Sequence, residues 1–214
     1  PLDISIQINS KQNPSFYDDN PIKIKYFESE NKVWSIAHGA SCNIPVINLN
    51  IHCGMTHTEC RSHITKEKLE ITSCIKNFFT KAHLISIKPS NIGIEKYHCK
   101  VAPNDLIITK EALVSKMATI NKKGLKSLII RTLPNSDTRL KEDYTKKNNS
   151  YFSNDAIHYI KSLAIENLIV DSPSIDKFDD GGKLGNHRIF WDLDVREPNK
   201  NTITELAYIN EDIK

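Results

Sequence analysis

Residues 50–63 bring together an unusual number of side chains that could bind a metal ion. They contain three of the chain's eight histidines, one carboxylate and two thiols: His52, His57, His63, Glu59, Cys53 and Cys60. Neutral imidazole and carboxylate are ligands that a borderline-soft divalent ion such as zinc accepts. A single histidine is more often a surface residue, or a buried residue whose ring nitrogens are hydrogen-bonded. The group as a whole favours a metal site, although its spacing matches neither a zinc finger nor the His-Glu-x-x-His helix.

The spacing within this stretch indicates which of its side chains act together. His57 and Glu59 are two residues apart, so in an extended segment both point to the same face. A carboxylate placed there can bind one ion with each of its oxygens. His63 lies just beyond, in a position that suits a base better than a ligand.

Two predicted strands would position further polar groups. Before the motif, Ile47, Leu49 and Ile51 alternate with polar residues, which predicts a strand that carries His52 on its polar face. Near the end of the chain, a strand is predicted over residues 202–206. Glu205 lies there on an otherwise apolar face, where a carboxylate is costly unless it is paired or bound to metal.

The rest of the chain predicts a mixed α/β fold. Alternating or apolar runs predict further strands at residues 2–8, 22–27, 33–37, 83–87, 127–131 and 167–171. Helices are predicted after Thr109 and after Ser153, which are both suitable N-caps. Strand, helix, strand in the second half predicts a right-handed parallel crossover. We find no repeat, linker or low-complexity tract, so residues 1–214 are expected to form one domain.

The motif resembles a known family. Gly54, Thr56, His57, Glu59 and His63 resemble the His-x-Gly-Thr-His-x-Asp-x-Pro-x-His signature of the cyclase family of metal-dependent hydrolases, which includes bacterial kynurenine formamidase and isatin hydrolase. Residues 171–176, with 186–188, are similar to the family's Asp-Thr-Pro-Ser-x-Asp and its later histidine. Residues 202–206 are similar to the strand with its last metal-binding glutamate. These matches follow the family's order along nearly the whole chain.

The resemblance implies a swivelling β/β/α fold and two divalent metal ions, zinc or manganese. His57, Glu59 and an upstream group would hold the first ion. For that group we favour His52, with Cys53 as the alternative, because the family's first histidine stands four residues before the position of His57. The second ion would be held by Glu59, His187 and Glu205, and His63 would be the general acid/base. Met55 and Glu59 depart from the family's usual Gly and Asp.

The resemblance also implies an activity. The expected reaction is hydrolysis of the C–N bond of an amide, formamide or lactam in a small molecule, as in an arylformamidase, by water that the metals activate. An aromatic residue, Phe16 or Tyr17, would cover the substrate, unless both only pack their loop. A homodimer or homotetramer is expected. The alternatives are a cysteine hydrolase that uses Cys60 with His57 or His63, polyketide-type cyclisation, and a non-enzymatic, metal-stabilised binding protein.

Composition excludes several other classes of protein. Hydrophobic residues make up 39% of the 214 and charged residues 26%, which is typical of a globular protein. The net charge is only +3 and the lysines are spread along the chain, so we expect no nucleic-acid partner. No apolar run approaches the roughly 18 residues of a membrane span. Five cysteines, an odd number without framework spacing, favour free thiols and the cytoplasm.

Overall fold

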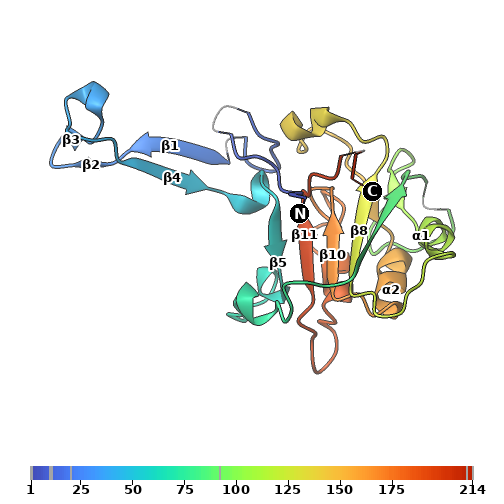
Figure 1. Ribbon diagram of the computed structural model, residues 1–214. Coiled ribbons are helices and arrows are strands. Elements are labelled where there is room, and N and C mark those ends of the chain that lie inside the picture. Colours follow the sequence, from blue (N-terminus) through green and yellow to red (C-terminus); the bar gives the residue numbers. More distant parts are fainter. Residues whose placement is uncertain (1, 10–11, 20, 92, 211, 214) are drawn as a thin grey trace.

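The fold is built around one five-stranded sheet with the strand order β5-β11-β10-β8-β6 (Figure 1). The computed structural model describes residues 2–9, 12–19, 21–91, 93–210 and 212–213. Neighbours among the last four strands of this order run parallel, whereas β5 pairs antiparallel with β11. The strands are β5 (His57–Glu59), β6 (Ala82–Ile87), β8 (Ser127–Thr132), β10 (Asn167–Val170) and β11 (Thr202–Glu205).

The core lies between this sheet and three helices, α1 (Lys110–Met117), α2 (Asn154–Ser162) and α3 (Gly185–Phe190). Alternate residues of the strands, such as Leu128 and Ile130, point into the core and are fully buried. Thr109 and Ser153 cap α1 and α2, and each side chain accepts a hydrogen bond from a backbone N–H of the first turn, as predicted. Among the described residues, no helix could span a membrane.

A long hairpin, which we call the arm (residues 21–50), extends away from the rest of the molecule, the body (Figure 1). Strands β1 (Ile22–Tyr26) and β4 (Pro45–Leu49) pair antiparallel along its length. Its tip contains β2 (Glu28–Ser29), β3 (Lys32–Val33) and the 3-10 helix η1 (Ile36–His38). The body adds the short strands β7 (Ile107–Ile108) and β9 (Tyr151–Phe152) and the 3-10 helices η2 (Ile51–Cys53), η3 (Arg61–His63), η4 (Ile71–Ser73) and η5 (Asp137–Lys141).

The structure corrects three of the predicted elements. Residues 2–8 form no strand, because their backbone makes separate hydrogen bonds, such as Tyr208 N–H to Ile4 O, and no ladder. The strand predicted over 33–37 ends at Val33 and gives way to η1. The strand before the motif ends at Leu49, so His52 lies on η2. The predicted strands at 83–87, 127–131 and 167–171 are confirmed as β6, β8 and β10.

Gly54 fixes the base of the arm against the body. A Cβ atom at this position would lie 2.5 Å from both Pro14 O and Pro21 Cγ. The backbone at Gly54 is extended, with φ −177°, so the requirement is for space and not for an unusual conformation. The glycine therefore lets Pro14 and Pro21 approach the loop that carries His52.

We expect Gly54→Ala to destabilise the protein by about 1–3 kcal/mol, because the added methyl group forces apart close-packed backbone and ring atoms. A thermal unfolding curve, monitored by circular dichroism, measures this effect. An unchanged melting temperature would show that this contact is loose in solution.

Candidate metal centre

The centre begins where β5 meets β11 at the edge of the sheet. His57 lies directly opposite Glu205 in the antiparallel register, and Glu59 lies opposite Ile203. His57, Glu59 and Glu205 are buried, whereas Thr58 between the first two is exposed. The prediction that His57 and Glu59 share one face is therefore confirmed, and Glu205 joins them from the neighbouring strand.

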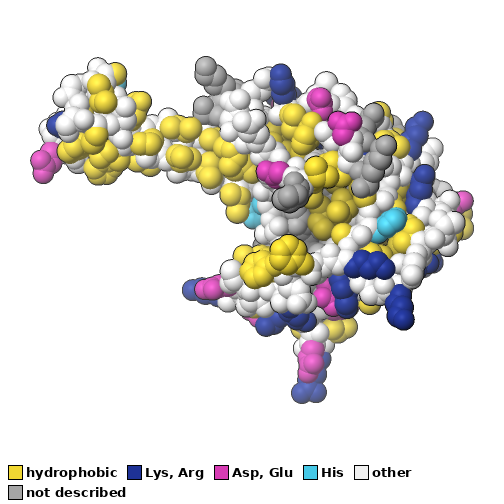
Figure 2. Space-filling model, viewed as in Figure 1, with side chains coloured by type: hydrophobic (Ala, Val, Ile, Leu, Met, Phe, Trp, Pro, Cys, Tyr) yellow, Lys and Arg dark blue, Asp and Glu magenta, His cyan; other side chains and the backbone are white. Residues whose placement is uncertain are grey.

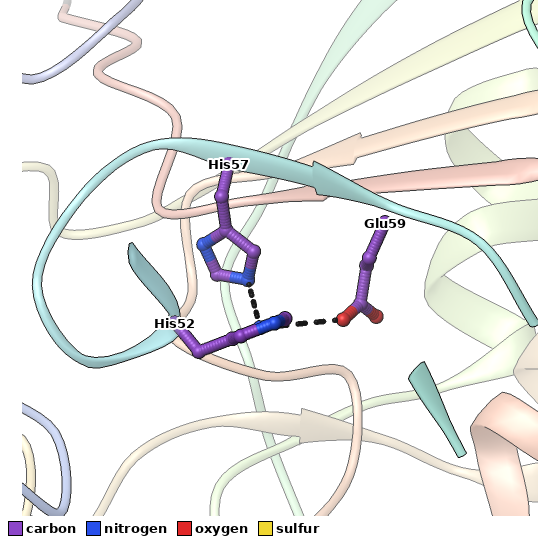
Figure 3. A group of neighbouring side chains, drawn as sticks. All are labelled: His52, His57 and Glu59. Carbon is purple, nitrogen blue, oxygen red and sulfur yellow. Dashed lines mark hydrogen bonds and ion pairs between the residues drawn. The ribbon is translucent and has the colours of Figure 1, made fainter. Parts of the chain in front are cut away.

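His52 completes a first group of possible ligands with His57 and Glu59 (Figure 3). The Nδ1 atom of His52 lies 3.0 Å from His57 Nε2 and 3.6 Å from Glu59 Oε2. The two imidazole rings meet edge to face, with their centres 4.5 Å apart. Of the two upstream residues considered from the sequence, it is His52 and not Cys53 that the structure brings into this group.

The hydrogen bonds of His57 prepare its ring to bind a cation. Its Nδ1 lies 2.9 Å from the carbonyl oxygen of Met55, which can only accept, so Nδ1 carries the proton. In the neutral ring, Nε2 then presents a lone pair toward His52 and toward Glu205 Oε2, which is 3.8 Å away. A carbonyl partner of this kind fixes the orientation of many metal-binding histidines.

A second group of possible ligands consists of Glu59, His187 and Glu205. The Nε2 atom of His187 lies 3.0 Å from Glu59 Oε1 and 3.6 Å from Glu205 Oε1. Glu205 Oε1 also accepts the backbone N–H of Ile175. All three side chains are buried, and Glu59 belongs to both groups.

Asp176 orients His187, a role that the sequence reasoning did not assign. Its Oδ2 lies 2.7 Å from His187 Nδ1 and also accepts the backbone N–H of His187. Its Oδ1 accepts the backbone N–H of Asn186. Asp176 therefore holds the start of α3 and directs His187 Nε2 toward the two glutamates. The role of Asp176 could have been inferred from the motif at residues 171–176, which carries part of the family resemblance.

Asp176→Asn is expected to weaken metal binding at the second group by about 10–100-fold, because the amide no longer holds His187 Nδ1–H as a charged acceptor does. Competition with a chromophoric chelator measures this change. Asp179→Asn, on the exposed loop that follows, is the control. Equal affinities for both variants and the wild type would contradict the orienting role.

The electrostatics of the buried carboxylates call for a cation. Burial, followed by the charge of Glu59, raises the pKa of Glu205. Hydrogen bonds to Asp176, Glu205 and Glu59 outweigh burial and raise the pKa of His187 well above its usual value. In addition, Glu59 Oε2 is buried without a hydrogen-bond partner among the described residues. A divalent ion satisfies this oxygen and the facing lone pairs together, so the residues fit a metal.

His63, on η3, lies beside the first group. Its Nε2 is 3.5 Å from Glu59 Oε2, and its ring stacks on that of His52 with centres 4.4 Å apart. The side chain is about one-third exposed. Burial is the main cause that lowers the pKa of His63, so the ring is neutral at pH 7 and free to accept a proton.

The pKa of His52 predicts how the metal-free protein responds to acid. Burial, with smaller effects of His57 and His63, lowers this pKa to about 4. Because the folded protein disfavours the charged ring, stability present above pH 6.5 is lost as the pH falls toward 4. Melting temperatures of the metal-free protein over this range test the prediction, with His52→Asn expected to flatten the decline.

The remaining predicted residues lie outside the two groups. Cys60 Sγ is buried near Ser62 Oγ and Leu69 O, and no hydrogen bond joins it to a histidine in the part of the chain that the structure describes. Phe16 is buried and contacts Tyr17 and Phe178. Tyr17 is 62% exposed, stacks on Phe178 and donates its hydroxyl hydrogen to Phe178 O.

A third group of possible ligands, His98 with Asp176 and Asp180, lies at the N-terminal end of α3. No metal-like neighbour in the sequence indicates a role for His98. Asp180 Oδ2 lies 3.0 Å from His98 Nε2 and accepts the backbone N–H of Leu184, while Asn154 Nδ2 lies 3.1 Å from His98 Nδ1. These atoms already have hydrogen-bond partners, whereas Glu59 Oε2 has none among the described residues, so this group supports the start of α3.

Comparison with known proteins identifies the family of the chain. The family model described as "Putative cyclase" matches residues 2–177. The chain belongs to the cyclase family. The match ends before His187 and Glu205, which the structure brings to the site from the remaining part of this cyclase-family chain. A search of curated proteins found no match.

Solved structures of other proteins share the fold of this cyclase-family protein. An isatin hydrolase bound to the product analogue thioisatinate is 14% identical, with a TM-score of 0.62 and 100% of this chain and 81% of that chain covered. A predicted metal-dependent hydrolase from Bacillus stearothermophilus is 13% identical, with a TM-score of 0.59 and coverage of 98% and 83%. Isatin hydrolase A from Labrenzia aggregata is 10% identical, with a TM-score of 0.59 and coverage of 99% and 81%. These likenesses show the mixed α/β fold.

Proposed function

We propose that this cyclase-family protein is a metal-dependent hydrolase that cleaves the C–N bond of an amide, formamide or lactam, in the manner of an arylformamidase. The observation that carries the proposal is the pair of ligand groups that share Glu59, with His63 beside them. Several proteins with this fold are described as metal-dependent or isatin hydrolases. Isatin is a lactam, which supports this substrate class.

Two divalent ions, zinc or manganese, would be held by the residues already described. His52, His57 and Glu59 would hold one, and Glu59, His187 and Glu205 the other. When bound, such ions polarise a carbonyl group and increase the acidity of water. Imidazole and carboxylate ligands accept both metals.

The protein's own residues would then position the reactants and transfer the proton. His63 is neutral at pH 7 and partly exposed, so it can take a proton from water and return it to the leaving nitrogen. Its stacking on His52 keeps the ring beside the metal ligands. His57 and His187 keep their Nε2 atoms directed inward because Met55 O and Asp176 hold their Nδ1 atoms.

An aromatic cluster, Phe16 with Tyr17 and Phe178, would contact a flat substrate. The backbone N–H of Phe16 donates to Cys53 O, which joins this loop to the segment that carries His52. Tyr17 is largely exposed and has a left-handed backbone, with φ +63°, which is unusual for a residue other than glycine. Both predicted substrate residues thus lie in one cluster, with Tyr17 the more accessible.

The test begins with metal removal and reloading. The metal-free protein is supplied with zinc or manganese and assayed on aryl formamides, lactams and lactones, with His57→Ala in parallel. We expect turnover that requires metal, is highest for the C–N substrates and is lost in the variant. Full metal loading without turnover would instead indicate a metal-stabilised binding protein. Activity that survives a metal chelator but is lost with a thiol-blocking reagent would indicate a cysteine hydrolase that uses Cys60.

A further inference from the structure

A cavity of about 430 Å³ opens at the edge of the sheet where the neighbouring parallel strands β6, β8 and β10 end. Among the residues that line it, Lys88 directly follows β6, Thr132 ends β8, and Asp171 directly follows β10. Open α/β sheets commonly bind their ligands at the carboxyl ends of parallel strands. The volume also lies in the range of pockets that hold small molecules. The position and size of the cavity therefore suit a small ligand.

The cavity is separate from the candidate metal centre. All the residues that line it lie in the body, between positions 88 and 173. Figure 2 shows a broad hollow between the arm and the body, and the cavity is a different feature because its wall belongs to the body alone. A ligand in the cavity would therefore leave free the residues of the two groups that share Glu59, which are His52, His57, Glu59, His187 and Glu205.

A buried ion pair fixes the shape of the cavity. Arg139, on η5, donates from Nη1 to Asp171 Oδ2 and from Nη2 to Asp171 O, both at 2.9 Å. The backbone N–H and the hydroxyl group of Thr132 donate to the same carboxylate, at 2.8 and 2.9 Å. These bonds join the segment that carries η5 to the ends of β8 and β10. A site whose walls are already ordered binds a ligand at a lower cost in conformational entropy.

Much of the wall is apolar and flat. Proline rings and one aromatic ring present rigid surfaces on which an aromatic ring of a ligand can pack. Pockets for small molecules are typically lined in this way, with a few polar groups that fix the orientation of the ligand. The apolar residues of the wall are Pro89, Leu106, Leu133, Pro134, Tyr144 and Pro173.

The cavity also has a cation that can receive an anionic group. Of the three basic residues in its wall, Arg139 pairs with Asp171, and Lys147 pairs with Glu142 at 2.7 Å. Lys88 is exposed, and it forms no ion pair with any residue that the structure describes. Its ammonium group can therefore form a charge-assisted hydrogen bond with a carboxylate.

A buried acceptor in the same wall lacks a partner. Asn149 donates from Nδ2 to Tyr144 O, but its Oδ1 atom is buried without a hydrogen-bond partner among the described residues. Buried polar atoms are normally hydrogen-bonded, and an amide oxygen can only accept. A hydroxyl or amino hydrogen of a ligand would satisfy this oxygen.

We propose that the cavity binds a small aromatic carboxylate that also carries a hydrogen-bond donor. The aromatic ring packs on the apolar wall, the carboxylate meets Lys88, and the donor meets Asn149 Oδ1. The proposal does not depend on the hydrolase activity, because binding here requires neither a metal ion nor turnover.

Isothermal titration calorimetry of the full chain with para-hydroxyphenylacetate tests the proposal. The titration is made after metal removal and again after loading with zinc, because a carboxylate could otherwise bind to a metal ion. We expect a single molecule to bind per chain in both states. Lys88→Met should weaken this binding by about 10-fold, since a charge-assisted hydrogen bond is lost. The uncharged para-hydroxyphenylacetamide should bind equally well to the wild type and to this variant.

The control variant is Lys122→Met, which removes an exposed lysine from outside the cavity and should bind para-hydroxyphenylacetate like the wild type. Hydrogen exchange locates the site, because amides of residues 132–150 should exchange more slowly with the carboxylate bound, while those of β1 and β4 stay unchanged. Binding only after zinc loading, no binding at millimolar concentration, unchanged exchange at residues 132–150, or equal affinities of Lys88→Met and the control would each overturn the proposal.

Discussion

Glu59→Gln is expected to lose both of the proposed metal ions and at least about 1000-fold in catalytic rate. Glu59 is the residue that the two ligand groups share, and its Oε2 atom is buried without a hydrogen-bond partner among the described residues. The amide has nearly the same shape but carries no charge, so the packing is retained while the bridging ligand is lost. Metal analysis by mass spectrometry and the kcat of the reloaded protein measure the two effects.

Variants of ligands that belong to only one of the two groups, which we call the outer ligands, provide the matched comparison of metal content for Glu59→Gln. His52→Ala removes a ligand from the first group only, and Glu205→Gln removes one from the second only. Each should therefore lose about one equivalent of metal where Glu59→Gln loses two. If Glu59→Gln kept as much metal as either outer variant, the shared role of Glu59 would be wrong.

His63→Gln is expected to lower kcat by about 100- to 10,000-fold while both of the proposed metal ions stay bound. His63 lies beside the ligand groups without belonging to them, and its partly exposed imidazole is next to Glu59. Loss of proton transfer should reduce kcat with little change in KM. Metal content equal to that of the wild type separates this effect from loss of a ligand.

The pH profile gives an independent check on His63. Its pKa is lowered from 6.5 mainly because burial disfavours the charged ring. The neutral ring accepts the proton, so wild-type activity should fall as the pH drops below 6.5 and through the lowered pKa. Nearby cations would lower that pKa further. The residual activity of His63→Gln should not show this fall at low pH. If the fall were unchanged in the variant, it would have to come from the titration of another group.

The side chains on the sheet could be predicted from sequence because strand geometry is simple. The two-residue period alone places His57 and Glu59 on one face, and an isolated carboxylate on an apolar strand identifies Glu205. Apolar runs such as Leu128–Ile130 predict the buried parallel strands. These inferences need only local periodicity, and the structure confirms the placement.

The parts that could not be predicted depend on contacts between distant segments. Helix α3 has only six residues and follows Leu184, whose backbone is left-handed. The sequence therefore contains neither a helical hydrophobic periodicity nor a suitable N-cap residue from which this helix could be predicted. The bond between Asp176 and His187 depends on where that helix docks. Residues 2–8 alternate as a strand would, but Ile6 is bonded by a side chain, Thr56, and not by a neighbouring strand.

The position of β11 has a consequence for the order in which the molecule folds. Among the described residues it is the last strand in sequence, yet it lies between β5 and β10. Thr58 and Thr204, which meet across β5 and β11, are 146 residues apart in sequence. Contacts of this range are slow to form, because the intervening chain must first be ordered. We therefore expect the candidate metal centre to assemble late in folding, so that a bound ion would stabilise the completed molecule over partly folded forms.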